Sequence, residues 1–361
     1  MAPSRDVSPL HPDGNPVDTS MLESVEVEVK KRQGPFLHIA CAVDGSLMSD
    51  KSMGSALSYF NSRRGDKFTV IHISDSSKSY LSKHLQPAHL KNYYVDMAHG
   101  ARVKAEWLCR EKEEGRSTCE SLTRLADKAG TDLLVLGSWG RKGEKLDMLG
   151  TVSDFSLRQA HCSICIVRSA GAGSGLSGVA GGGGPSAAAL ASRPARFMFA
   201  TDGSHAAHLA FCTLVNYLMR PIDSVAVIMV TTADGTEETK MVAQYAEFMK
   251  KRKIACPVHV KVVDRTSGSV PEGICSAVAE HGCDTLVMGI SGYGRKKLGS
   301  VSEDISTRAS CTTIIIKDSR EVMSDRYTTA GIGTLAREVE TAPIMQEREA
   351  RQSSFRRATE Q

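Results

Sequence analysis

The chain has 361 residues, which is enough for two domains, and its apolar share of 41% excludes an intrinsically disordered protein. A formal net charge of +4 over this length does not indicate a nucleic-acid-binding protein, because such proteins concentrate basic residues on one face. No run of about 18 apolar residues predicts a membrane span, and residues 1–6 carry no apolar signal region. We therefore expect a cytoplasmic protein without membrane or nucleic-acid partners, whose ten cysteines are reduced and mostly buried.

Residues 1–33 are rich in Pro, Ser and Asp and lack a sustained apolar period, so we predict a mostly disordered tail. Val25, Val27 and Val29 alternate with glutamates, a pattern that also fits a short edge strand. After this tail, short apolar runs alternate with stretches of helical periodicity, which predicts a parallel sheet. We predict strands at residues 35–43, 68–73, 103–109, 132–136 and 163–167, and helices at residues 49–61, 118–129 and 152–159, with a helical or irregular stretch at residues 78–99.

Residues 169–193 are nearly all Gly, Ala and Ser, a composition typical of a flexible linker. After the linker the pattern of the first unit repeats. We predict strands of the second copy at residues 197–200, 225–230, 257–263, 284–289 and 311–317. The sequence therefore predicts two tandem α/β domains, at residues 34–168 and 194–318. Residues 319–361 have balanced charge and few apolar residues, and we predict a disordered C-terminal tail.

A glycine-rich segment follows the fourth predicted strand of the first domain. It reads Gly137-Ser138-Trp139-Gly140, then a loop with Arg141 and further basic residues, then Gly150-Thr151-Val152-Ser153 at the start of a predicted helix. Glycines let the backbone approach a ligand closely, and the first amides of a helix lack internal partners and attract anions. The segment therefore indicates a phosphate site. An ordinary strand-to-helix turn, in which glycine is also common, remains the alternative.

These residues also carry a family resemblance. The spacing Gly137-x2-Gly140-x9-Gly150-Thr151 resembles the ATP-binding signature of the universal stress protein family, G-x2-G-x9-G-[S/T]. The resemblance covers about residues 36–168 and 195–317. It implies two doubly wound, five-stranded parallel-sheet domains in tandem, related to the adenine nucleotide alpha hydrolase fold, with strand order 3-2-1-4-5. It further implies that the two domains pair as a pseudo-dimer through their fifth strands; whether the whole chain also forms a homo-oligomer stays open.

The resemblance also assigns candidate site residues in the first domain. It implies that Asp44 lies near the ribose and adenine, although a cap of the following helix is an equal alternative. Ile73 would meet adenine through its backbone, and the glycine segment would hold ribose and phosphates, with Ser153 adding a hydroxyl. The full candidate set is Ala42, Val43, Asp44, Ile73, Leu136, Gly137, Gly140, Arg141, Gly150, Thr151, Val152 and Ser153.

The second copy departs from this signature. Gly289 and Gly292 keep the first spacing, but only six residues separate Gly292 from Gly299, which makes the loop three residues shorter. Because loop length sets where basic side chains reach, we expect the first domain to be the better nucleotide site. The weaker candidates are Asp202, Val230, Gly289, Gly292, Gly299 and Ser300.

Other pairs of ligand-type residues are weaker signals. Cys162 and Cys165 form a C-x2-C, but residues three apart on a strand point to opposite faces, so buried thiols are favoured over a metal site. His205 and His208 have helical spacing without a third ligand, which favours a solvated helix face. Asp44 and Asp202 are candidates for binding Mg²⁺ on nucleotide phosphates.

The resulting functional prediction is a module that binds ATP, ADP or AMP and acts in a stress response. No residue pattern marks a general base, so the chain is at most a slow ATPase. Two alternatives are retained: an enzyme that hydrolyses nucleotide or transfers adenylyl groups, and a scaffold that binds no nucleotide.

Overall fold

The structure is a computed structural model, and it describes residues 5–6, 17–78, 82–143, 148–168, 193–232, 235–263, 268–290 and 299–317. Residues Met1–Asp318 form one unit, which contains both predicted domains. The predicted linker at residues 169–193 lies outside the described residues except for its last residue, and the predicted C-terminal tail lies wholly outside them.

The first domain places its strands in the order that the family resemblance implies. From edge to centre the strands run β4-β3-β2-β5-β6, and each neighbouring pair is parallel, which confirms the order 3-2-1-4-5. Its elements are β2 (His38–Ala42), α2 (Leu47–Tyr59), η1 (Ser62–Arg64), β3 (Lys67–Ser74), η2 (Ser76–Lys78), η3 (Lys83–Leu85), α3 (Pro87–Gly100), β4 (Ala105–Glu111), α4 (Thr118–Lys128), β5 (Leu133–Gly137), α5 (Thr151–Gln159) and β6 (Ser163–Val167).

The second domain repeats this topology, with parallel strands in the order β9-β8-β7-β10-β11. A two-residue strand near the N-terminus, β1 (Arg5–Asp6), pairs antiparallel with β9. The domain's own elements are β7 (Arg196–Ala200), α7 (His205–Thr213), η4 (Leu214–Leu218), β8 (Ser224–Thr231), α8 (Thr236–Lys250), β9 (Val258–Val262), α9 (Val270–Glu280), β10 (Thr285–Ile290), α10 (Ser300–Arg308) and β11 (Thr312–Lys317).

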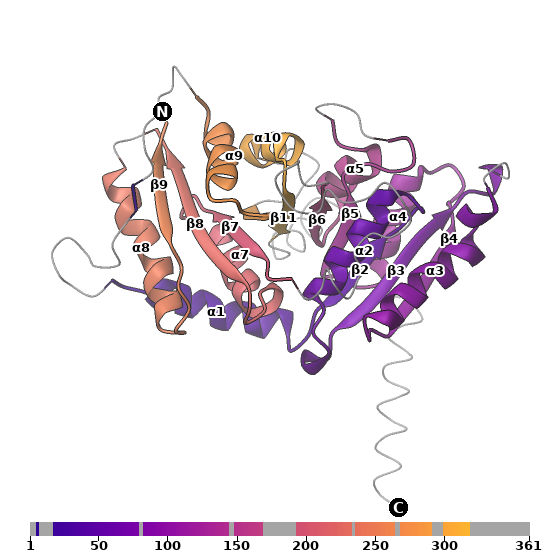
Figure 1. Cartoon of the computed structure of the whole chain (residues 1–361), viewed down its shortest axis with the longest axis horizontal. Helices are drawn as coiled ribbons and strands as arrows, with labels where there is room; N and C mark the ends of the chain where they lie inside the picture. The colour runs from indigo at the N-terminus through magenta and orange to yellow at the C-terminus, as the bar shows by residue number, and fades with distance from the viewer. Residues whose placement is uncertain are drawn as a thin grey trace, which may run out of the picture. The chain divides into compact units, whose positions relative to one another are not determined.

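The two domains meet through their fifth strands. β6 and β11 pair antiparallel, with Cys165 opposite Ile314, so the described strands form one sheet of 11 strands (Figure 1). This pairing confirms the predicted intramolecular pseudo-dimer. An antiparallel pair between equivalent strands relates the domains by an approximate two-fold rotation, as in the common symmetric dimers.

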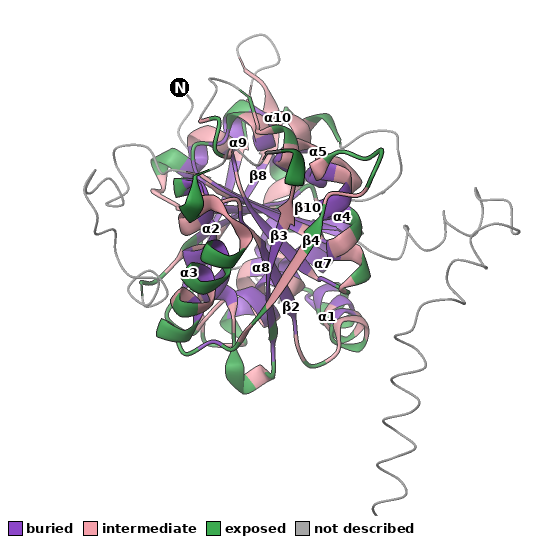
Figure 2. Cartoon of the chain, turned by 90° about the vertical axis from the view of Figure 1, so that its right-hand side faces the viewer, coloured by how far each residue is buried: buried purple, intermediate pink, exposed green. Residues whose placement is uncertain are grey.

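Helices cover both faces of this sheet. One apolar cluster joins the sheet to α2, α3, α7 and α8, and a second joins its other face to α4, α5, α9 and α10. Figure 2 shows the buried strands between helices whose outer sides are exposed. Strands that are buried on both faces appear in the sequence as continuous apolar runs, and for this reason the strands could be predicted from the sequence.

The helix α1 (Ser20–Gln33) corrects one prediction. Residues 20–33 are neither disordered nor an edge strand: Leu22, Val25 and Val29 are buried, whereas Val27 is 68% exposed. The spacing of the buried residues is i, i+3, i+7, the period of a helix, which the Val–Glu alternation obscured. Although α1 precedes the first domain in sequence, it packs on α7 and α8 of the second (Figure 1).

Candidate functional site

A cavity of about 400 Å³ opens at the carboxyl ends of β2, β3 and β5. β2 lies between β3, the next strand in the chain, and β5, which the chain reaches only after β4 at the edge of this domain. The strand order therefore reverses beside β2, and open α/β sheets bind ligands at such a switch point. The cavity brings together all twelve candidates of the first domain: Ala42, Val43, Asp44, Ile73, Leu136, Gly137, Gly140, Arg141, Gly150, Thr151, Val152 and Ser153. Their part in nucleotide binding stays a prediction.

The carboxylate of Asp44 organises the loop between β2 and α2. Its Oδ1 accepts hydrogen bonds from the Ser46 amide at 3.0 Å and the Ser49 hydroxyl at 2.8 Å. Ser46 is the N-cap of α2, and its hydroxyl accepts from the Ser49 amide. Burial alone would raise the pKa of Asp44, but the hydrogen bonds from Ser46, Ser49 and Arg141 outweigh it and lower the pKa. Asp44 is therefore an ionised carboxylate that supports the start of α2.

The same carboxylate also holds the glycine loop. Asp44 Oδ2 accepts a hydrogen bond from the Arg141 amide at 3.1 Å, and the Arg141 Nε lies 3.8 Å away. A Cβ at Gly140 would lie 2.6 Å from this oxygen, so only glycine fits there without displacing Asp44. The Asp44 carboxylate thus connects the start of α2 to the glycine loop, and its role as a Mg²⁺ ligand stays a prediction.

The start of α5 presents free backbone donors to the cavity. Gly150 is the N-cap, and within the described residues no side chain caps this helix and no acceptor pairs with the amides of Thr151, Val152 or Ser153. The Gly150 amide instead donates to the Ser138 carbonyl at 2.7 Å, which positions the helix start. These three amides and the positive end of the helix dipole form an anion site.

The hydroxyl of Ser153 has a different partner from the one that the resemblance implied. Ser153 is buried, and its Oγ donates to the Gly137 carbonyl at 2.6 Å. This hydrogen bond ties α5 to the end of β5 and uses the one proton of the hydroxyl, and a phosphate role for Ser153 stays a prediction. Its backbone amide remains directed outward at the helix start.

Apolar side chains line the other part of the cavity. Ile71 and Leu122 belong to the buried cluster beside α4, and Thr118 begins that helix at the cavity's edge. The candidate set did not include these residues, nor Ser49, His72, Trp139, Lys142, Gly143, Met148 and Leu149, although Lys142 is one of the basic residues noted in the loop. Their signal was positional: each lies within a few residues of the carboxyl end of a strand at this edge of the sheet, or at the start of the helix that follows.

His72 is a buried polar residue of β3, and its side chain lies on the face of the sheet opposite to Ile71. Its Nδ1 donates to the Val43 carbonyl at 2.8 Å, and its ring stacks on Trp107 with centroids 6.0 Å apart. Burial lowers the pKa of His72, so the ring is neutral at pH 7. With Nδ1 protonated, Nε2 is an acceptor.

The second domain gathers fewer of its candidates. Asp202 is exposed and accepts from the Ser204 amide at 2.9 Å, which repeats the turn at Asp44. Gly289 packs against α7, where an added Cβ would lie 2.3 Å from the Ala206 carbonyl oxygen. Val230, the last residue but one of β8, is half-buried, Gly299 and Ser300 are exposed at the start of α10, and Gly292 lies outside the described residues.

The other ligand-type residues have structural partners. A solvated helix face was predicted for His208, and this prediction is wrong. His208 is buried, and its Nδ1 lies 2.7 Å from the Tyr245 hydroxyl oxygen. Cys162 and Cys165 are buried free thiols, and burial raises the pKa of each to about 12. Within the described ranges, no three His, Cys, Asp or Glu side chains are placed to hold a metal ion, and each helix is too short or too polar for a membrane span.

Comparison with known families decides what this fold is. A model described as the universal stress protein family matches residues 35–168 and residues 195–317, together well over half of the chain. The chain belongs to the universal stress protein family. The two matches correspond to the two sheet halves that β6 and β11 join.

Solved structures of other proteins show the same fold. A functionally unknown protein from Pseudomonas aeruginosa PAO1 is 10% identical with a TM-score of 0.55, over 83% of this chain and 98% of that chain. A universal stress protein from Archaeoglobus fulgidus DSM 4304 is 17% identical with a TM-score of 0.51, over 79% of this chain and 99% of that chain. At these identities the similarity establishes the fold alone.

Proposed function

We propose that the first domain of this universal stress protein binds ATP or ADP and acts as a nucleotide-dependent regulatory module in a stress response. The observation that carries the proposal is the set of three unpaired amides at the start of α5, which open on the same cavity as an apolar lining. A nucleotide needs two kinds of surface in its site. Hydrogen-bond donors bind its phosphates, here called the phosphate half of the cavity, and an apolar surface binds its base, here called the base half.

The phosphate half supplies donors and positive charge. An anion at a helix N-terminus gains about 0.3–1 kcal/mol from the dipole at exposed sites and ~2 kcal/mol in partly buried ones. Hydrogen bonds from the amides of Thr151, Val152 and Ser153 add to this, and Arg141 and Lys142 line the same cavity. The Asp44 carboxylate is kept from repelling the phosphates because Arg141 and the start of α2 neutralise it.

The base half supplies size and an apolar surface. A cavity of about 400 Å³ lies within the usual range of ~300–1,000 Å³ for small-ligand sites. Ile71, Ile73 and Leu122 offer an apolar surface for a planar base. The choice of adenine rests on the glycine spacing, which resembles the family's ATP-binding signature.

Binding without rapid turnover suits this cavity. Among its described lining residues the carboxylate is Asp44, whose oxygens already accept from Ser46, Ser49 and Arg141, so it is a poor general base. The proposed role is therefore occupancy rather than catalysis. All ten cysteines are described and free, which is consistent with function in a reducing compartment such as the cytoplasm.

A proline substitution tests the phosphate half directly. Thr151 is the first residue of α5, where a helix tolerates proline, and Gly150 has φ −61° and ψ 145°, which suit a residue before proline. Thr151→Pro removes one amide donor while leaving the helix intact. We expect ATP affinity to fall about 10- to 100-fold, the effect of one charge-assisted hydrogen bond of ~1.5–3 kcal/mol.

Two variants control this test. Thr151→Ala keeps the amide and removes the hydroxyl, which separates the two donors of this residue. Ser300→Pro makes the same change at the equivalent start of α10, where Gly299 has φ −56° and ψ 143°, and should leave ATP affinity unchanged. Equal ATP affinity in wild type and a folded Thr151→Pro variant would reject the proposed phosphate site.

A further inference from the structure

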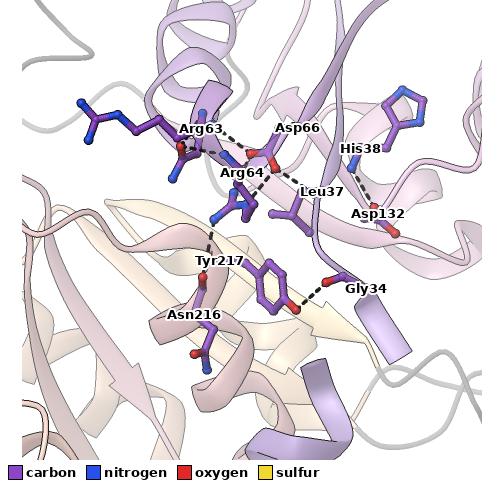
Figure 3. Close-up of polar contacts among 10 residues, drawn as sticks. Gly34, Leu37, His38, Arg63, Arg64, Asp66, Asp132, Asn216 and Tyr217 are labelled. Carbon is purple, nitrogen blue, oxygen red and sulfur yellow. Dashed lines mark hydrogen bonds and ion pairs between the residues drawn. The ribbon is translucent and has the colours of Figure 1, made fainter. Parts of the chain in front are cut away.

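The contacts that join the two domains are made within one chain. The fifth strands, β6 and β11, pair with each other, and the Tyr217 hydroxyl of the second domain donates to the Gly34 carbonyl at 2.8 Å (Figure 3). Arg64 of the first domain also donates to the Asn216 carbonyl of the second. The fifth strands are therefore occupied inside the chain, and a homo-oligomer has to use another surface.

The two ends of the sheet differ. At one end β1 adds antiparallel to β9, with Asp6 opposite His259. At the other end β4 has β3 as its neighbour, and no further strand follows it among the described residues. Figure 2 looks onto this end of the sheet and shows β4 in the colours of half-buried and exposed residues. β4 is thus an edge strand, and such a strand presents backbone groups that can pair with another chain.

The pairing of β4 with β3 determines which backbone groups lie on the open side. The Lys112 amide donates to the Ser74 carbonyl, and every second residue before Lys112 faces β3 in the same way. The residues between them direct their N–H and C=O groups outward; these are Ala105, Trp107, Cys109 and Glu111. In agreement with this, the Cys109 carbonyl accepts from the exposed guanidinium of Arg110 at 3.1 Å.

The residues of β4 are complementary to a second, antiparallel copy of the same strand. In a two-fold pair centred on Leu108, Trp107 lies opposite Cys109 of the second copy, and their outward N–H and C=O groups exchange hydrogen bonds. Glu106 then lies opposite Arg110 of the second copy, in the non-hydrogen-bonded type of pair whose side chains are closer. Both side chains are exposed, and the two-fold axis repeats their pairing at the other end of the strand.

The charges of β4 favour this register over its neighbours. A slide by two residues in one direction would place Arg110 opposite Lys104, and like charges directly opposite each other are destabilising. A slide by two in the other direction would place Leu108 opposite Arg110. A slide by one would set outward groups against groups already bonded to β3. In the favoured register Lys104 faces Lys112 just beyond the strand, where Lys112 already pairs with Asp75 at 3.5 Å.

We propose that two copies of this chain dimerise through β4, with the strands antiparallel about Leu108 and Glu106 paired with Arg110 on both sides of the axis. The sheet of one copy then continues into that of the other. Arg110 exchanges its bond to the neighbouring Cys109 carbonyl for the ion pair, because that carbonyl accepts the Trp107 amide of the second copy. The inference is independent of the proposed nucleotide site.

Sedimentation velocity of the full chain over a range of concentrations tests this interface. We expect wild type to show a reversible equilibrium between monomer and dimer. Glu106→Arg and Arg110→Glu each place like charges opposite each other on both sides of the axis, so each should raise the dissociation constant of the dimer at least about tenfold. The double variant Glu106→Arg/Arg110→Glu exchanges the two charges and should dimerise like wild type.

An equimolar mixture of the two single variants tests the register as well. One chain then has arginine at both positions and the other has glutamate at both, so the facing charges are opposite in the heterodimer alone. We expect the mixture to form dimers that neither variant forms by itself. Recovery in the mixture and in the double variant also shows that the single variants are folded.

Two variants control for the change in net charge. Glu114 and Arg63 are exposed and lie outside β4, and Figure 3 shows the Arg63 side chain directed away from the contacts between the domains. Glu114→Arg and Arg63→Glu should each dimerise like wild type. A wild type that stays monomeric at every concentration would overturn the proposal. So would wild-type dimerisation of both single variants, which indicates another surface, or a mixture of the two that does not associate.

Discussion

Arg168 and Lys317 occupy equivalent positions at the ends of the two paired strands, and each binds the final helix of the opposite domain. Lys317 Nζ donates to the carbonyls of Leu157 and Ala160 at 2.8 and 2.7 Å, at the end of α5. Arg168 donates to the Ser306 and Thr307 carbonyls, at the end of α10. Cations at helix C-termini satisfy the last carbonyls and complement the dipole. These hydrogen bonds therefore connect α5 to the second domain. The N-terminal end of α5 opens on the candidate nucleotide site.

The buried Lys317 should make stability depend on pH. Burial lowers the pKa of Lys317 from 10.5 to about 8. Between these values the unfolded chain binds more protons than the folded chain, so stability should rise with pH from about 8 to 10.5 and be insensitive to this group below that window. The full change amounts to about 3 kcal/mol.

Urea unfolding at several pH values between 7 and 10.5 measures this effect. The variant Lys317→Met should lose the rise, and the difference between wild type and variant isolates Lys317 from other titrating groups. Lys83→Met, on an exposed 3-10 turn, serves as the control and should follow wild type. If the unfolding free energies of wild type and Lys317→Met change with pH in parallel, folding does not lower the pKa of Lys317.

The helix α1 should contribute stability to the second domain. Leu22 is fully buried against α7, and its Leu22→Ala variant should lose about 2–5 kcal/mol of unfolding free energy, as is usual for such a cavity. Hydrogen exchange should show the loss first in α7 and α8. Val27→Ala, on the exposed side of α1, should change stability by less than ~0.5 kcal/mol. Loss of protection confined to the first domain would contradict the observed packing.

The equivalent glycines Gly150 and Gly299 should respond differently to alanine. Both are N-caps with similar backbone angles. A Cβ at Gly150 would lie 3.1 Å from the Ser138 oxygen and 3.2 Å from Trp139 Cα, whereas a Cβ at Gly299 would meet none of the described residues within 4 Å. Gly150→Ala should therefore displace the start of α5 and weaken ATP binding by at least about tenfold, while Gly299→Ala should not. Fluorescence or calorimetric titration of both folded variants measures the difference, and equal affinities would remove Gly150 from the site.

The sequence predicted the sheet and the cavity because local signals and chain order determine them. Buried parallel strands appear as apolar runs, and the order 3-2-1-4-5 brings the ends of β2 and β5 together. Asp44 and Gly140 could therefore be placed in one cavity before their geometry was known. The hydrogen bond from the Arg141 amide to Asp44 could not be predicted. Its donor is a backbone amide 97 residues away, and every residue type except proline has such an amide.

The failures have the same physical origin. Residues 20–33 lacked an apparent partner because α1 packs on α7, nearly 180 residues later in the chain. His208 was expected in solvent because its partner, Tyr245, lies on the next helix, 37 residues away. The hydrogen bond from the Ser153 hydroxyl to the Gly137 carbonyl was likewise not expected. Each error concerns a non-local partner that tertiary packing alone supplies.

Titration calorimetry of Mg-ATP into the unmodified full-length chain tests the central claim most directly, namely that the amides at the start of α5 and the apolar lining beside β3 form a nucleotide site. The account predicts saturable binding of one nucleotide per chain, with binding lost in the folded Thr151→Pro variant. Absence of saturable heat with ATP and with ADP, in a preparation shown to contain no bound nucleotide, would contradict it.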